Sequence, residues 1–124
     1  MNAFQYRGTS LLVEDLPLSA IAERFGTPTY VYSRRAIVDA FAEFRHAAGT
    51  RDVLVCYALK ANSNIAVIDL LAREGAGFDI VSGGELERVL AAGGDPSRVV
   101  FSGVGKQESE MRMALEAGVR CFNV

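Results

Sequence analysis

The sequence predicts an α/β fold in which short strands alternate with helices, as in a parallel sheet or a barrel. Apolar runs rich in Val, Ile, Phe and Tyr recur about every 20 to 25 residues. The intervals between them carry apolar residues at helical spacing. The run VLVC at 53–56 is continuously apolar, which is typical of a strand that is buried on both faces.

Five apolar runs are predicted as strands, and turn residues separate them. These strands are Tyr30–Tyr32, Val53–Tyr57, Phe78–Val81, Val99–Phe101 and Cys121–Val124. Ser10–Val13 is a further candidate strand. The segment from Pro17 to Phe25 has the pattern of a short amphipathic helix that ends at Gly26, and Thr27-Pro28 separates this helix from the next strand.

Four further helices are predicted, and they follow Ser33, Asn64, Gly84 and Lys106. Ser63 or Asn64 can cap the second of these helices, because their side-chain oxygens accept hydrogen bonds from amides of the first turn. Three glycines fall where helices end and left-handed backbone is expected, namely Gly75, Gly93 and Gly118. Asp95-Pro96 predicts a turn into the following strand.

The composition is that of a globular domain, with 50% hydrophobic residues, 23% charged residues and a net charge of -2. The absence of a basic block argues against a nucleic-acid partner. No apolar run reaches the roughly 20 residues that span a bilayer, and the N-terminus lacks the pattern of a secretory signal. We therefore expect no membrane partner and a cytoplasmic location.

The cysteines, Cys56 and Cys121, lie in apolar runs and are predicted to be buried free thiols. The single histidine, His46, is predicted on a partly exposed helix face. A metal site needs more ligands than these, so none is expected.

Lys60 directly follows an apolar strand, although lysine is rarely buried. At the carboxyl end of a barrel strand, its amine would point into the mouth where ligands bind. Desolvation there would favour the neutral amine, the form that attacks an aldehyde to make a Schiff base. A surface lysine is the alternative that the spacing leaves open.

Asp79 lies within another apolar strand, and a buried carboxylate needs a partner such as a cationic cofactor. The Ser82-Gly83-Gly84 turn that follows could bind an anion through its amides or let a ligand approach the backbone. The alternative is a βα turn in which the glycines serve the geometry and Glu85 stabilises the first helical turn.

A third polar cluster, Ser102-Gly-Val-Gly-Lys106, also follows a strand and precedes a helix. It lacks the spacing of a Walker loop. Because the βα loops of a barrel lie on one face, all three clusters are predicted to meet there.

Three ordered motifs, YALKANSN, GFDIVSGGEL and VVFSGVGK, resemble those of the diaminopimelate decarboxylases. These belong to the pyridoxal-phosphate (PLP) enzymes that include ornithine and arginine decarboxylases. The run PLSAIAERFGTPTYVYS is also similar to this family. The resemblance implies the N-terminal half of a PLP-binding (β/α)8 TIM barrel at 34–124, truncated at about strand four. It also implies that the strand region at 1–33 packs with a C-terminal β domain.

The resemblance further implies that Lys60 holds PLP covalently, with Ala58, Asp79, Glu85 and Ser102 near the cofactor. The implied reaction is decarboxylation of meso-2,6-diaminopimelate to L-lysine in lysine biosynthesis. The implied assembly is a homodimer. The alternatives are an ornithine- or arginine-type decarboxylase, a racemase or PLP carrier with the same barrel, and an inactive truncated product.

Other groups that the family uses are expected further along a full-length chain. They are the histidine that stacks on PLP, the Gly-rich phosphate loop, the acid bonded to the pyridine nitrogen, the substrate-binding Arg and Tyr, and a Cys from the partner subunit. We therefore expect the 124-residue chain to show no decarboxylase turnover by itself.

Overall fold

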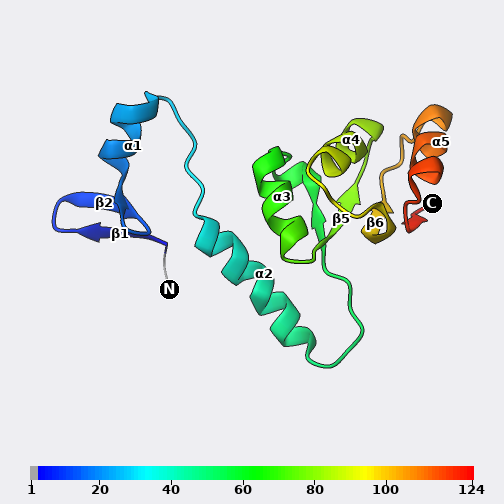
Figure 1. Cartoon of the computed structure of the whole chain (residues 1–124), viewed down its shortest axis with the longest axis horizontal. Coiled ribbons are helices and arrows are strands. Elements are labelled where there is room, and N and C mark those ends of the chain that lie inside the picture. The colour runs from blue at the N-terminus through cyan, green and yellow to red at the C-terminus, as the bar shows by residue number, and fades with distance from the viewer. Residues whose placement is uncertain (1–2) are drawn as a thin grey trace. The chain divides into compact units, whose positions relative to one another are not determined.

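The computed structural model describes residues 3–124 (Figure 1). It consists of two compact units, one that ends at Glu43 and one that runs from Phe44 to Val124. Helix α2 (Arg34–Ala48) contains the boundary between them. The resemblance to the family implied a different boundary, between a strand region at 1–33 and a barrel domain at 34–124. That boundary rests on the packing of 1–33 with a C-terminal β domain, and it stays a prediction.

The first unit contains a three-stranded antiparallel sheet in the order β1-β2-β3. Its elements are β1 (Phe4–Arg7), β2 (Ser10–Val13), β3 (Leu16–Pro17) and α1 (Leu18–Phe25). The predictions of β2 and α1 are confirmed, and Gly26 ends α1 at a φ of 79°. Strands β1 and β3 were not predicted. Strand β1 does alternate apolar and polar residues, whereas β3 has only two residues, too few to show any periodicity.

The predicted strand Tyr30–Tyr32 is wrong for the described chain, because this segment pairs with no other strand there. The side chain of Tyr30 is 89% exposed. A strand needs a neighbour for its amides and carbonyls, and apolar composition alone does not supply one. The helix predicted after Ser33 is confirmed as α2.

The second unit contains four parallel strands in the order β4-β5-β6-β7, which confirms the α/β prediction. They are β4 (Cys56–Ala58), β5 (Gly77–Ile80), β6 (Val99–Phe101) and β7 (Cys121–Phe122). The helices are α3 (Ile65–Arg73), α4 (Gly83–Ala91) and α5 (Glu108–Ala117). Short 3-10 turns cover Leu59–Ala61 and Pro96–Arg98. Strand β4 starts three residues later than predicted, and β7 is limited to two residues.

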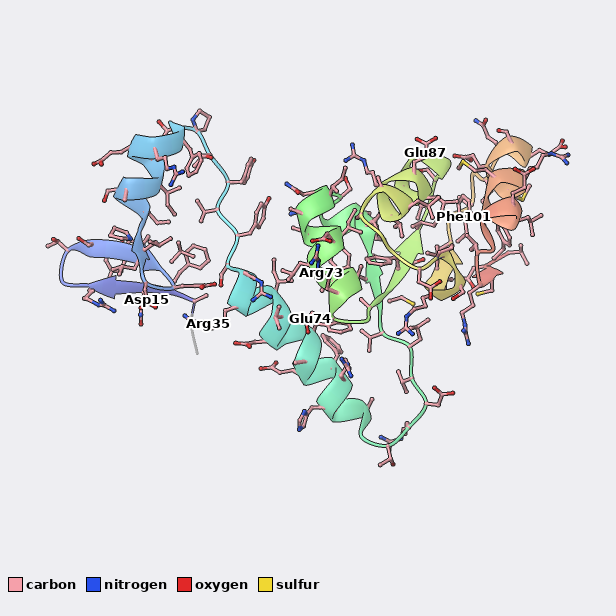
Figure 2. The ribbon with its side chains drawn as sticks, viewed as in Figure 1. Asp15, Arg35, Arg73, Glu74, Glu87 and Phe101 are labelled. Atoms are coloured by element: carbon pink, nitrogen blue, oxygen red, sulfur yellow. The ribbon has the colours of Figure 1, made fainter. Side chains whose placement is uncertain are left out.

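The core of the second unit lies between one face of this sheet and the helices. On the sheet, Phe78, Ile80, Val99 and Phe101 are fully buried, and on the helices Ile68, Leu86, Val89 and Ala114 are fully buried. Phe101 lies in this packed part of the molecule (Figure 2), stacked on Phe122 with ring centroids 5.6 Å apart. Each large apolar side chain buried here contributes about 1.5–3 kcal/mol.

The predicted helix ends and turns are confirmed. The Asn64 side chain accepts a hydrogen bond from the amide of Ala66 and caps α3. Three glycines have positive φ at or after the ends of α3, α4 and α5, namely Gly75, Gly93 and Gly118. Asp95 accepts from the amide of Ser97 in the turn before β6.

Both cysteines are free thiols, but only Cys56 is half-buried. Cys121 is exposed, so its predicted burial is wrong for the described chain. The reason is that Cys121 lies on β7, an edge strand of the described sheet. His46 is exposed in the last turn of α2, close to the prediction.

Candidate active site

Two of the predicted site residues, Ala58 and Asp79, lie in one row of paired residues that runs across the parallel sheet. In the parallel register, Ala58 on β4 pairs with Asp79 on β5, Asp79 with Val100, and Val100 with Cys121. Side chains alternate along a strand, so this row faces away from the helix-covered side on which Phe78 and Ile80 lie. Ala58 and Asp79 are thus adjacent on the open face of the sheet.

Asp79 carries a polar atom that lacks a partner. Its Oδ1 is buried, and no hydrogen-bond donor for it occurs among residues 3–124. A buried carboxylate oxygen without a donor is costly, and a cationic or hydrogen-bonding ligand would satisfy it. The prediction that Asp79 lies in an apolar strand and needs a partner therefore matches its environment.

Lys60 lies directly beyond β4, in the turn Leu59–Ala61, at the carboxyl edge of the sheet. Its side chain is exposed, whereas Leu59 before it is fully buried. Within the described residues, the Lys60 ammonium has no hydrogen bond or ion pair. The described residues therefore present the amine at the edge of the sheet but do not desolvate it.

The turn after β5 is organised by its own side chains. Ser82 accepts from the amide of Glu85 at 3.3 Å, and Glu85 Oε2 accepts from the amide of Val81 at 2.7 Å. These contacts agree with the alternative interpretation of Glu85, as a residue that stabilises the first turn of α4.

The amide of Gly83 donates to Glu110 Oε1 at 2.8 Å. Because a carboxylate already occupies this amide, the interpretation of the Ser82-Gly83-Gly84 turn as an anion site is not supported at Gly83. Hydrogen bonds from Gly83 and Gln107 hold the pKa of the Glu110 carboxyl below its ordinary value.

The third predicted cluster is tied to the end of β7. Ser102 Oγ accepts from Asn123 Nδ2 at 2.9 Å, and Lys106 Nζ donates to the carbonyl oxygens of Gly103 and Asn123 at 2.5 and 2.6 Å. Lys106 also lies 5.7 Å above the Phe101 ring. Asn123 was missed by sequence reasoning, since nothing in the local pattern distinguishes it from any polar residue after a strand.

Cys56 lies two residues before Ala58, so it shares the open face of the sheet with Asp79. Burial, followed by the negative charge of Asp79, raises the pKa of the Cys56 thiol. Cys56 is therefore a poor nucleophile.

Within residues 3–124, no group of three or more His, Cys, Asp or Glu side chains is arranged to hold a metal ion. In the same described range, every helix is too short or too polar to cross a membrane.

The structure therefore brings Ala58 and Asp79 side by side and places Lys60 and Ser102 at the same edge of the sheet. A parallel sheet with its polar loops at the carboxyl ends of the strands is the arrangement found at the ligand-binding face of α/β barrels. Residues 34–124 match the family described as "Pyridoxal-dependent decarboxylase, pyridoxal binding domain". The chain belongs to this family.

Individual relatives agree with this assignment. The chain is 63% identical over 124 residues to a diaminopimelate decarboxylase of Pseudomonas fluorescens, and it spans 30% of that relative's length. A crystal structure of an Aquifex aeolicus protein matches 98% of the chain at 45% identity, with a TM-score of 0.93 and 30% of its own length covered. The diaminopimelate decarboxylase of M. jannaschii, in a complex with L-lysine, matches 99% of the chain at 35% identity, with a TM-score of 0.85 and 30% of its length covered.

PLP is the cofactor of this family, and the described residues fit it. The cofactor needs a lysine amine that can bond to its aldehyde, and Lys60 is exposed and without a hydrogen bond in the described chain. The buried and unpartnered Asp79 Oδ1 lies on the strand next to the one that leads to Lys60.

Proposed function

We propose that this chain forms the lysine-bearing part of a PLP-dependent diaminopimelate decarboxylase, which converts meso-2,6-diaminopimelate to L-lysine. The observation that carries the proposal is the placement of an unengaged lysine, Lys60, beyond the strand whose last residue pairs with Asp79. The name of the Pseudomonas fluorescens relative supports the choice of substrate.

In this proposal Lys60 holds the cofactor covalently. Lys60 would supply the amine that holds the aldehyde of the cofactor. The described residues leave Lys60 exposed, so its amine is accessible to a ligand at this edge of the sheet.

The other proposed cofactor-binding residues lie on β4 and β5 and in the loops that follow β5 and β6. Asp79 offers an acceptor to a positively charged group, and Ala58 keeps the adjacent position on the sheet small. Ser102 receives a hydrogen bond from Asn123, so its own hydroxyl proton is free to be donated to a ligand. Glu85 holds the turn that follows Asp79. When bound, PLP supplies an electron sink that stabilises the charge left after carbon dioxide departs.

A hybrid enzyme tests the proposal, in which this chain replaces the matching 124 residues of the Pseudomonas fluorescens relative. Carbon dioxide release from meso-2,6-diaminopimelate is measured. We expect the hybrid to turn this substrate over and Lys60→Ala to abolish turnover. A hybrid without turnover, or a Lys60→Ala hybrid that kept it, would contradict the proposal.

A matched pair of variants tests the role of the turn after β5. Glu85→Gln removes the charge that accepts from the amide of Val81, whereas Glu87→Gln removes a charge on an exposed side chain of α4 (Figure 2). We expect the Glu85 variant to lose turnover and the Glu87 variant to retain it. Equal effects of the two substitutions would contradict the assignment of Glu85.

We also propose that the working protein is a cytoplasmic homodimer in which residues 1–33 pack with a β-rich domain. The support for this is the resemblance of the sequence motifs to the family. Analytical ultracentrifugation of the hybrid should give the mass of a dimer, and a monomer at enzyme-assay concentrations would contradict it. The 124-residue chain alone is expected to release no carbon dioxide, since it spans only 30% of the relative.

A further inference from the structure

The Lys60 side chain is exposed, and it has no hydrogen bond or ion pair within the described chain that would fix its orientation. Its position therefore depends on the backbone on either side. On the N-terminal side that backbone is fixed, because β4 pairs with β5 up to Ala58 and Leu59 is fully buried.

On the C-terminal side, two side chains hold consecutive carbonyl groups. The Tyr57 hydroxyl donates to the carbonyl oxygen of Asn62 at 3.0 Å. Arg88 Nη1 donates to the carbonyl oxygen of Ser63 at 3.1 Å. These two carbonyls lie between the Lys60 turn and the first residue of α3, where the backbone is neither strand nor helix.

The two donors come from different elements. Tyr57 lies on β4, so its hydrogen bond closes the loop that contains Lys60 onto the strand that precedes it. Arg88 lies on α4, three residues after Glu85 and therefore on the same side of that helix. The Arg88 hydrogen bond thus ties the Lys60 segment to the helix whose first turn contains Glu85.

We propose that Tyr57 and Arg88 are positioning residues for Lys60. They hold the segment 61–64 so that the Lys60 amine leaves the backbone in the direction needed to bond to the cofactor. This proposal rests on the proposed function, since it assumes that Lys60 is the lysine that carries PLP.

The test uses the hybrid enzyme with Tyr57→Phe, Arg88→Met and both substitutions together. In the cofactor-free protein, amide hydrogen exchange is followed in peptides that contain residues 61–64. PLP is then added, and the rate of its covalent attachment to Lys60 is followed by absorbance and by borohydride trapping. Tyr6→Phe and Arg112→Met are matched controls, because Tyr6 is 73% exposed and Arg112 pairs with Glu108 on its own helix.

We expect each single variant to attach PLP about fivefold more slowly, the effect of one average hydrogen bond, and to exchange faster at 61–64. The double variant should be slower still, and Arg88→Lys should recover part of the rate because an ammonium can also donate to the Ser63 carbonyl. The controls should match the unsubstituted hybrid.

Unchanged attachment rates would overturn the proposal, even if exchange at 61–64 became faster, because the two residues would then be merely structural. Failure of the proposed function has a different signature. In that case the unsubstituted hybrid attaches no PLP to Lys60, and the positioning role falls with it.

Discussion

The carboxylate of Glu110 on α5 accepts a hydrogen bond from the amide of Gly83 at the start of α4, 27 residues earlier, at 2.8 Å. Its other oxygen accepts from the amide of Gln107 at 2.9 Å. One side chain thus joins the loops that follow β5 and β6. Both loops lie at the carboxyl edge of the sheet, where the proposed site is.

Glu110 should make the stability of the second unit depend on pH. Its two hydrogen bonds hold the pKa of the carboxyl below the ordinary value, so the folded state favours the ionised form. The resulting stabilisation is present above the unfolded-state pKa and is lost as the pH falls through the lowered folded-state pKa. We expect Glu110→Gln to lower the melting temperature at neutral pH and to have less effect in acid.

Thermal unfolding followed by circular dichroism from about pH 7 down to about pH 3 measures this effect. Glu116→Gln is the control, since Glu116 is an exposed residue of the same helix. If the melting temperatures of the Glu110 variant and the unsubstituted chain differed by the same amount at every pH in this range, the stabilising role of the ionised Glu110 carboxylate would be contradicted.

Gly77 should not tolerate a side chain. A Cβ there would lie 2.6 Å from the carbonyl oxygen of Arg98 and 2.8 Å from Cys56 Sγ, and the first of these is backbone that cannot rotate away. We expect Gly77→Ala to cost about 1–3 kcal/mol in the free energy of unfolding, as overpacking does. Urea denaturation measures it.

Gly84→Ala is the matched control for Gly77→Ala. No atom lies within 4 Å of a Cβ added at Gly84, and the residue is in the first turn of α4. This substitution should be neutral or stabilising by up to about 1 kcal/mol. A loss as large as that of Gly77→Ala would mean that close packing is not the cause.

Ser33 should be important for the start of α2. Its hydroxyl oxygen accepts from the amide of Ala36 at 3.0 Å, and the hydroxyl donates to Glu14 Oε1 at 2.6 Å. Ser33 is also buried, so its loss leaves polar groups without partners. We expect Ser33→Ala to cost about 1–2 kcal/mol and to increase amide exchange in the first turn of α2. Ser19→Ala, at an exposed position of α1, should change neither quantity.

Phe101 should be one of the largest single contributors to the core of the second unit. It is fully buried and stacks on Phe122. Phe101→Ala should cost about 3–5 kcal/mol, whereas Leu115→Ala, at a residue that is 68% exposed, should cost less than about 0.5 kcal/mol. Comparable losses at the two positions would show that the sheet does not pack against the helices as described.

The positions of the candidate residues could be predicted because each signal is local. Lys60 follows an apolar strand, Asp79 interrupts one, and the glycines after the helices mark their ends. The alternation of strands and helices then places these residues at one edge of the sheet without knowledge of any contact.

The contacts that hold the site could not be predicted in this way. Arg88 bonds to a residue 25 positions earlier and Glu110 to one 27 positions earlier, and no local pattern specifies such pairs. Pairing also explains the error at Tyr30–Tyr32, where the composition suits a strand but the described chain provides no neighbour. The same applies to Cys121, whose burial depends on what lies beside β7.

The assignment of Lys60 is tested most directly by locating the covalent attachment of PLP. Within this chain lysine occurs only at positions 60 and 106, and Lys106 is engaged with the carbonyl oxygens of Gly103 and Asn123. The hybrid is incubated with PLP, reduced with borohydride and digested, and the modified peptide is identified by mass spectrometry. We predict that the adduct is on Lys60, that Lys60→Ala removes it and that Lys106→Arg retains it. An adduct on Lys106, or on any other lysine of the unsubstituted hybrid in place of Lys60, would contradict the account.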